Sequence, residues 1–268
     1  MMGAMSLAQT WRDQRERRFH PDRDAARDII AELAARLPSL RYNDADASFV
    51  VTTYLDTRDG HYFQLADKAN GARSLKLRIR EYLWIGADGD VHYEDSCYLE
   101  RKQREGDVRL KQRIPIRKRD VVGVVLGDRK LRDASPEAAA VRGEIESYKL
   151  RPALVSAYER RVFGDETQLR VTFDERVGFY APPRGLYNMA PALTQDVLGS
   201  PLALGPSRIL ELKQSRGVPA PAWLEALLDS LTAAPGYSKF RDGMRAIQHA
   251  DGKPRDLTRR ITIPNDVC

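Results

Sequence analysis

The sequence predicts an α+β fold in which antiparallel strands close into a β-tunnel with flanking helices. Three observations favour it: segments of alternating apolar and charged residues recur along the chain, helical segments lie between them, and no repeat or linker divides the chain. Because side chains alternate across a strand, residues two apart share a face. These strands therefore have an apolar face for a core and a second face of arginine, lysine and glutamate.

Composition restricts both the kind of protein and the kind of partner. The 268 residues carry a net charge of +6, which favours a polyanionic partner: a nucleic acid, a membrane surface or a phosphate-rich molecule. The two cysteines, Cys97 and Cys268, make no disulfide framework, which is typical of reducing compartments. The longest apolar stretch is too short to span a bilayer, and no signal peptide is evident. We therefore expect a cytoplasmic protein without a transmembrane segment.

Periodicity predicts the order of helices and strands. Helices are expected at 21–37, 119–126, 135–148, 222–231 and 239–248. Strands are expected at 48–56, 75–84, 97–104, 108–116, 155–163, 168–174 and 209–214. Residues 181–207 are rich in proline and glycine and are expected to form a loop with short helical pieces. We predict a single domain over 11–250, a flexible leader at 1–10 and a polar tail at 251–268.

The charged faces of the strands carry the chemical information. Lys76, Arg78 and Arg80 share one face of their strand, and the residues between them are apolar. The same alternation gives charged faces with Glu100 and Lys102, with Arg109, Lys111 and Arg113, with Arg160, with Arg170 and Asp174, and with Glu211 and Lys213. For any single strand, a solvated face is the ordinary explanation. Together these faces are mostly basic, and in a closed sheet such charges would crowd unless a polyanion, acids or water screened them.

A chain of phosphates is a polyanion that fits these residue types. Arginine binds phosphate oxygens bidentately, lysine adds a point charge, and a few glutamates suit a hard divalent ion beside the phosphates. The sequence contains no Gly-x-x-x-x-Gly-Lys phosphate loop and no nucleophile elbow, and its histidines lack metal-ligand spacing. We therefore expect phosphoryl transfer that depends on positioning and charge neutralisation.

Short motifs in a fixed order resemble those of the triphosphate tunnel metalloenzymes (the CYTH-like superfamily), and within them the VTC domain of polyphosphate polymerases. The motifs are ERRF at 16–19, YLDT at 54–57, KLRIREY at 76–82, LERK at 99–102, LKQR at 110–113, YER at 158–160, LRVTFD at 169–174, LELK at 210–213 and SKF at 238–240. Each motif alone is weak, but their order and spacing over most of the chain are fairly specific.

The resemblance implies an eight-stranded tunnel and a role for particular residues. By position, it implies catalytic roles for Arg78, Arg80, Lys102, Arg160, Arg170 and Lys239. It implies phosphate binding by Arg18, Lys76, Lys111, Arg113, Lys213 and Ser238, and binding of Mn²⁺ or Mg²⁺ by Glu211 with help from Glu100. The superfamily usually has Glu-x-Lys in its first strand, where this chain has Glu16-Arg17-Arg18. Because arginine does not lose its proton, we expect no proton transfer at Arg18.

The resemblance also implies ATP-dependent polyphosphate synthesis, with ATP, triphosphate or polyphosphate as the partner and no nucleic acid. Hydrolysis of an inorganic or nucleoside triphosphate is the alternative, because it needs nearly the same pocket. An alternative of another class is a non-catalytic module that binds polyphosphate or nucleic acid on an open basic face. A partner protein in the membrane is compatible with each of these. The alternatives differ first in whether Lys76, Arg78 and Arg80 face a closed lumen.

Overall fold

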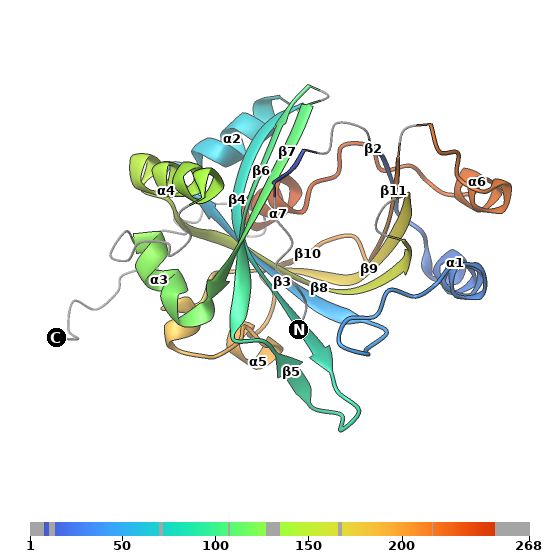
Figure 1. The fold of residues 1–268 in the computed structure, drawn as a ribbon, viewed down its shortest axis with the longest axis horizontal. Coiled ribbons are helices and arrows are strands. Elements are labelled where there is room, and N and C mark those ends of the chain that lie inside the picture. Colours follow the sequence, from blue (N-terminus) through green and yellow to red (C-terminus); the bar gives the residue numbers. More distant parts are fainter. Residues whose placement is uncertain are drawn as a thin grey trace.

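A computed structural model describes residues 8–10, 14–69, 72–106, 108–126, 135–165, 168–215 and 217–249. Within them, one antiparallel sheet has the order β1-β7-β6-β4-β3-β8-β9-β11-β2, while β5 pairs with β4 and β10 with β9 (Figure 1). The strands are β1 (Ala8–Thr10), β2 (Gln14–Phe19), β3 (Ser48–Asp56), β4 (Arg73–Ile85), β5 (Val91–Tyr93), β6 (Ser96–Glu105), β7 (Val108–Arg117), β8 (Arg151–Gly164), β9 (Leu169–Tyr180), β10 (Ala203–Leu204) and β11 (Arg208–Ser215). The helices are α1 (Arg23–Arg36), α2 (His61–Lys68), α3 (Lys118–Leu126), α4 (Pro136–Tyr148), the short 3₁₀ helix η1 (Leu186–Asn188), α5 (Gln195–Leu198), α6 (Ala222–Asp229) and α7 (Lys239–His249). The predicted tail at 251–268 and most of the predicted leader lie outside the described residues.

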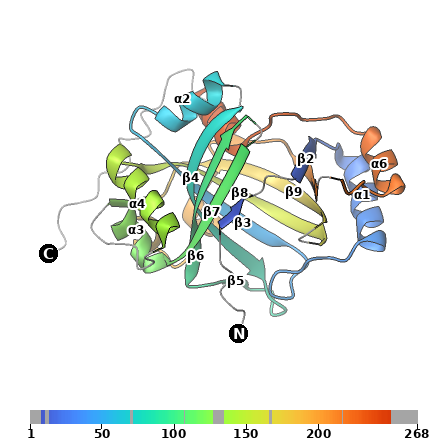
Figure 2. The ribbon, with the colours of Figure 1, turned by 45° about the horizontal axis from the view of Figure 1, so that its top comes forward.

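The sheet curls until its two edges approach each other. β1 and β2 are close in sequence but pair with opposite edges, β1 with β7 and β2 with β11. The guanidinium of Arg109 on β7 lies 2.8 Å from the carboxylate of Glu16 on β2. In Figures 1 and 2 the wall of β4, β6 and β7 stands across from β11 and β2, and the space between them is called the lumen below. The arrangement confirms the predicted α+β tunnel.

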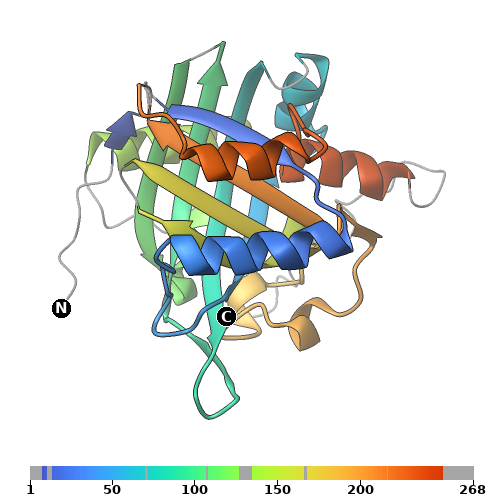
Figure 3. The same cartoon turned by 90° about the vertical axis from the view of Figure 1, so that its right-hand side faces the viewer.

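Helices cover the outside of the sheet in two groups. α1 and α6 pack on β2, β9 and β11 around Leu33, Phe173, Leu212 and Leu224, and Figure 3 shows both helices on that side of the sheet. α2, α3, α4 and α7 contribute to a larger apolar cluster with β3, β4, β6, β7, β8 and parts of β9 and β11. The apolar faces predicted from the alternation therefore form the two cores, which leaves the charged faces to the lumen. Among the helices of the described residues, none has the length and apolar character needed to cross a membrane.

The helix α2 was not predicted, and its start explains why. The Asp56 carboxylate accepts hydrogen bonds from the backbone N–H of Tyr62 (2.9 Å) and of Phe63 (3.0 Å). The Thr57 hydroxyl accepts one from the N–H of His61 at 2.9 Å. These side chains satisfy N–H groups that the first turn of a helix leaves unpaired. A short helix that is capped from the preceding strand shows little helical period of its own.

The strand β9 is longer than predicted, because a bulge breaks its alternation. The predicted strand ended at residue 174, whereas β9 continues to Tyr180. The pairing of β8 with β9 shifts between Ala157 and Glu159, and Arg176 has a φ of 55°. Such an extra residue reverses the inside–outside pattern beyond it. Residues 181–207 form the expected loop, with η1, α5 and β10 as its short regular pieces.

Candidate functional site

Two rows of charged side chains cross the wall formed by β4, β6 and β7. The first row is Arg78, Glu100 and Arg113, and the second is Lys76, Lys102 and Lys111. Directly opposite residues of an antiparallel pair project their side chains to the same face. Both rows therefore lie side by side on one face of this wall.

Two matching rows cross the wall formed by β9, β11 and β2. The first is Arg170, Lys213 and Glu16, and the second is Thr172, Glu211 and Arg18. Burial lowers the pKa of Lys102 well below its usual 10.5, and the positive charge of Lys213 lowers it further. Arg18 likewise contributes to lowering the pKa of Lys76, after burial, Lys102 and Arg78. Since these pairs lie on strands far apart in the sheet order, the two walls face each other across the lumen.

Glu100 is the centre of the first charged cluster. Its carboxylate is fully buried and receives the Arg78 guanidinium at 2.7 Å and the Arg113 Nε at 2.6 Å, with the Lys111 ammonium at 3.7 Å. Burial opposes ionisation, but the charges of Arg78, Arg80 and their neighbours hold the pKa of Glu100 well below its usual range. Glu100 therefore stays ionised and fixes two guanidinium groups at the lumen surface.

Glu211 is the centre of the second cluster, on the opposite wall. One carboxylate oxygen lies 2.8 Å from the Arg18 Nε and the other 2.9 Å from the Lys213 ammonium. Burial again opposes ionisation, while Lys213, Arg18, Arg160 and Lys102 hold the pKa of Glu211 well below its usual range. Its side chain keeps 15% exposure. Glu211 is thus a charged carboxylate that remains accessible from the lumen.

The Asp174 side chain on β9 binds Arg160 of β8 and Lys239 at the N-terminus of α7. Arg160 donates to both of its carboxylate oxygens, at 2.6 and 2.8 Å, and the Lys239 ammonium donates at 2.6 Å. The ring of Tyr158 lies under both cations, 5.2 Å from the Arg160 guanidinium and 4.3 Å from the Lys239 ammonium. Two predicted site residues are therefore held by two residues that sequence reasoning did not assign.

Arg80, on β4, directs its guanidinium toward β3 and β8. Its Nε donates to the Thr52 hydroxyl at 3.2 Å, and the Tyr158 hydroxyl lies 3.5 Å from its NH2 group. Arg113 donates to the Tyr82 hydroxyl at 3.1 Å. Burial would raise the pKa of Tyr82, but the positive charges of Arg80 and Arg113 lower it overall. These contacts orient guanidinium groups without neutralising them.

The segment before α7 closes on the lumen from one end. The Lys76 ammonium donates to the Ser238 hydroxyl at 2.8 Å, and Arg18 donates to the carbonyl of Tyr237 at 3.1 Å. Ser238 also caps α7, since its hydroxyl accepts from the N–H of Arg241 and its own N–H donates to Asp242. Ser238 is thus brought to β4, 162 residues earlier in the chain, and Lys239 to Asp174 on β9, 65 residues earlier.

The predicted site residues therefore all lie in or beside the lumen, and the structure adds others to them. The additions are Glu16, Thr52, Tyr82, Tyr158 and Asp174. Glu16, Tyr82, Tyr158 and Asp174 stand within the motifs, so their position gave a signal. Thr52 gave none, because β3 has no alternating charges.

Crowding of positive charge is the main electrostatic property of the lumen. Burial and neighbouring cations lower the pKa of Lys76 and Lys102 well below 10.5, and burial lowers that of Lys111 to about 7. Glu100, Glu211 and Asp174 are each shared by at least two cations. An anionic ligand would relieve this repulsion.

Glu211 is the candidate ligand for a divalent ion among the predicted site residues. The described residues contain no group of three or more histidine, cysteine, aspartate or glutamate side chains that could hold a metal. Mg²⁺ is often held by one or two carboxylates together with phosphate oxygens and water, and the accessible Glu211 carboxylate suits that arrangement. Both oxygens of the buried Glu100 already contact arginine, so its role as a second ligand stays a prediction.

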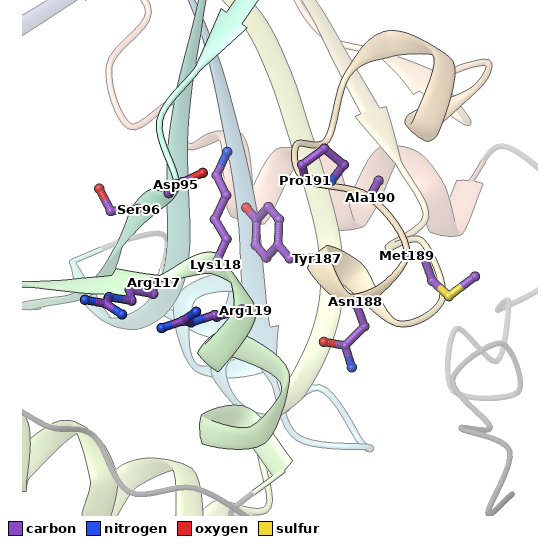
Figure 4. Close-up of a pocket in the computed structure, with 10 residues that line it drawn as sticks. All are labelled: Asp95, Ser96, Arg117, Lys118, Arg119, Tyr187, Asn188, Met189, Ala190 and Pro191. Atoms are coloured by element: carbon purple, nitrogen blue, oxygen red, sulfur yellow. The ribbon is translucent and has the colours of Figure 1, made fainter. Parts of the chain in front are cut away.

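A second pocket lies outside the lumen and takes in none of the predicted site residues. It has a volume of about 850 Å³ and lies between the start of α3 and the loop that follows η1 (Figure 4). Lys118 and Tyr187 line it, and both contact the buried carboxylate of Glu81 on the outer face of β4, at 2.7 and 3.1 Å. This carboxylate also accepts the N–H of Leu193 at 3.0 Å. In this cluster the Glu81 carboxylate and the Lys118 ammonium neutralise each other.

Comparison with solved structures shows the same fold in other proteins. A candidate adenylate cyclase from Bacillus halodurans has a TM-score of 0.53 and 14% identity, over 85% of this chain and 95% of that one. A candidate adenylyl cyclase from Hippeastrum, described as having a dominant triphosphatase activity, has a TM-score of 0.51 and 17% identity, over 91% of this chain and 97% of that one. A search of curated protein sequences found no match.

The comparison with family models gives the classification. The model of the VTC domain matches residues 13–248, which include β2, all of α7 but its last residue and every strand that lines the lumen between them. The charged rows, the Ser238 closure and every strand of the curled sheet except β1 fall within that match. The chain therefore belongs to the VTC domain family.

Proposed function

We propose that the tunnel binds the phosphates of ATP and transfers the terminal phosphoryl group to the end of a polyphosphate chain, with Mn²⁺ or Mg²⁺ as cofactor. The observation that carries the proposal is the excess of positive charge on two facing walls: burial lowers the pKa of Lys76 and Lys102, and the neighbouring cations lower it further. A chain of phosphates supplies regularly spaced negative charge along a narrow space. Membership of the VTC domain family supports the polymerase over other phosphoryl transfers.

The residues divide the work between positioning and charge. Arg78 and Arg113 are held by Glu100, and Arg160 by Asp174, so their guanidinium groups keep a fixed direction. Prearranged donors of this kind stabilise the charge of a transferring phosphoryl group without reorganisation. Lys76, Lys102 and Lys111 add positive charge, and bound phosphate would stabilise the protonated form of these three side chains. A divalent ion would neutralise phosphate oxygens, with Glu211 as its protein ligand.

Hydrolysis of an inorganic or nucleoside triphosphate is the second candidate. Similarity in fold to the Hippeastrum protein with dominant triphosphatase activity favours it. The two activities differ in the acceptor, which is water in hydrolysis and a terminal phosphate in synthesis. A non-catalytic module that binds polyphosphate would retain the lumen contacts but produce neither product. Cytoplasmic location and a partner protein in the membrane stay predictions.

The test is an assay of purified protein with ATP and Mn²⁺ or Mg²⁺ that separates long polyphosphate from free phosphate. We expect metal-dependent polyphosphate. Formation of free phosphate alone would indicate hydrolysis instead of synthesis. The absence of both products would favour a binding module. Arg27→Ala serves as a control variant, because Arg27 is 78% exposed on α1 and far from the tunnel in the fold.

The metal role of Glu211 is tested by Glu211→Gln. We expect turnover to fall by a factor on the order of 100 or more at every metal concentration, since the metal loses its protein ligand. Phosphate binding without metal should persist or tighten, because a negative charge leaves the lumen. Wild-type turnover with an unchanged requirement for Mn²⁺ would remove Glu211 from the metal site.

A further inference from the structure

One face of β4 changes from basic to aromatic along its length. Lys76, Arg78 and Arg80 are followed on the same face by Tyr82 and Trp84, as the pairing of β4 with β3 and β5 shows. At about 3.3 Å per residue, Trp84 lies about 13 Å beyond Arg80 along the strand. Figures 1 to 3 show that this end of β4 and its partner β5 extend past the other strands, away from α7.

Four aromatic side chains meet at this end of the tunnel: Tyr42, Tyr82, Trp84 and Tyr98, here called the aromatic mouth. Tyr42 stacks on Tyr82 with ring centres 5.1 Å apart and meets the ring of Trp84 at 5.6 Å. Tyr82 meets Tyr98 edge-on at 6.3 Å. All four are partly exposed, unlike the aromatic residues of the cores. Trp84 also stacks on the ring of His92 at 5.8 Å, so a planar ligand would stack on the ring faces that remain exposed.

The aromatic mouth is continuous with the cations of the lumen. Arg113 donates to the Tyr82 hydroxyl at 3.1 Å, and its guanidinium lies 4.4 Å from the centre of the Tyr98 ring. The same Arg113 is bound to Glu100 at 2.6 Å. A ligand that reaches from the mouth to Glu100 therefore passes from ring faces to phosphate-binding groups with no gap between them.

We propose that the aromatic mouth stacks the base of a nucleoside triphosphate whose phosphates extend along Arg80 and Arg78. The inference rests on the proposed function and adds the place of the base and the direction of the nucleotide in the tunnel. A planar base joined to a chain of phosphates has the same order of chemistry as the face of β4. The nucleotide then lies with its base at β5 and its terminal phosphate toward Lys76 and Lys102.

The test compares a ligand that has a base with one that lacks it. Equilibrium binding of a non-hydrolysable ATP analogue and of inorganic tripolyphosphate is measured for the wild type, Tyr42→Ala and Trp84→Ala. We expect the affinity for the ATP analogue to fall about tenfold in each variant, because one stacking partner is lost, and that for tripolyphosphate to stay unchanged. Tyr93→Ala is the matched control: Tyr93 is an exposed aromatic residue of β5 that pairs opposite Leu83, on the other face.

The outcomes separate this inference from the proposed function. Unchanged affinity for the ATP analogue in both variants would overturn the base site, as would an equal loss for both ligands, which indicates a damaged tunnel end. Wild-type protein that binds tripolyphosphate at least as tightly as the ATP analogue would also overturn the base site and leave the tunnel function intact. Wild-type protein that binds neither ligand would contradict the proposed function itself.

Discussion

Two buried clusters of charge lie on opposite faces of β4, and they differ in their balance. On the outer face, Glu81 contacts one ammonium, that of Lys118, and completes its hydrogen bonds with Tyr187 and the N–H of Leu193. On the lumen face, the Glu100 carboxylate faces two guanidinium groups and an ammonium. The outer cluster is complete as it stands. The lumen cluster has more positive than negative charge. We therefore assign a role in stability to the outer cluster and a role in ligand binding to the lumen cluster.

The largest effect on stability is expected from Glu81→Gln. The variant leaves the Lys118 ammonium buried without its counter-charge, so we expect the free energy of unfolding to fall by about 3–5 kcal/mol. Activity per folded molecule should stay close to that of the wild type. Denaturant unfolding measures the change, with Tyr187→Phe as a control that removes one hydrogen bond and costs about 1 kcal/mol. A loss no larger than that of the control would show that the outer cluster is not structural.

The opposite pattern is expected from Lys102→Met in the lumen. Lys102 is repelled by Lys213, Arg78 and Arg18, so its removal should leave the melting temperature unchanged or raise it. Turnover should fall about 10²-fold, since a positive charge next to the phosphates is lost. A variant with lowered stability and wild-type turnover would erase the difference between the two clusters.

A smaller effect is expected from pH. The pKa of Lys111 is about 7 in the folded protein, against its usual 10.5, so between these values only the unfolded chain binds this proton. Stability of the ligand-free protein should therefore rise with pH above 7, by at most about 1.4 kcal/mol per pH unit for this group. Unfolding curves between pH 7 and 9 measure it, and Lys111→Met should have a smaller slope. If Lys111→Met has the same dependence of stability on pH as the wild type, Lys111 does not have a lowered pKa in the folded protein.

The sequence predicted which residues share a face of each strand, but not which residues of other strands lie next to them. Alternation alone assigned Lys76, Arg78 and Arg80 to one face, because a period of two needs no tertiary information. It could not pair Lys102 with Lys111, or bring Lys213 across the lumen, since register and curvature depend on the whole sheet. The resemblance in motifs implied a tunnel lined by these residues, but it predicted neither of these contacts.

The residues missed by sequence reasoning are those whose role depends on a distant partner. Asp174 was on a predicted charged face, but only the fold places Arg160 and Lys239 on its two oxygens. Thr52 belongs to an apolar strand, and its contact with Arg80 follows from the register of β3 with β4. The aromatic mouth has the same origin, because Tyr42 reaches Tyr82 and Trp84 from a loop forty residues earlier in the chain.

The most direct test of the central claim is a crystal structure of the protein with tripolyphosphate and Mn²⁺. We predict phosphate oxygens within hydrogen-bonding distance of Arg78, Arg160 and Lys102, and an anomalous manganese signal beside Glu211. The Glu81 pair on the outer face should keep its geometry without ligand. Phosphate bound only on the outside of the sheet, with the lumen cations still paired as in the free protein, would contradict the account.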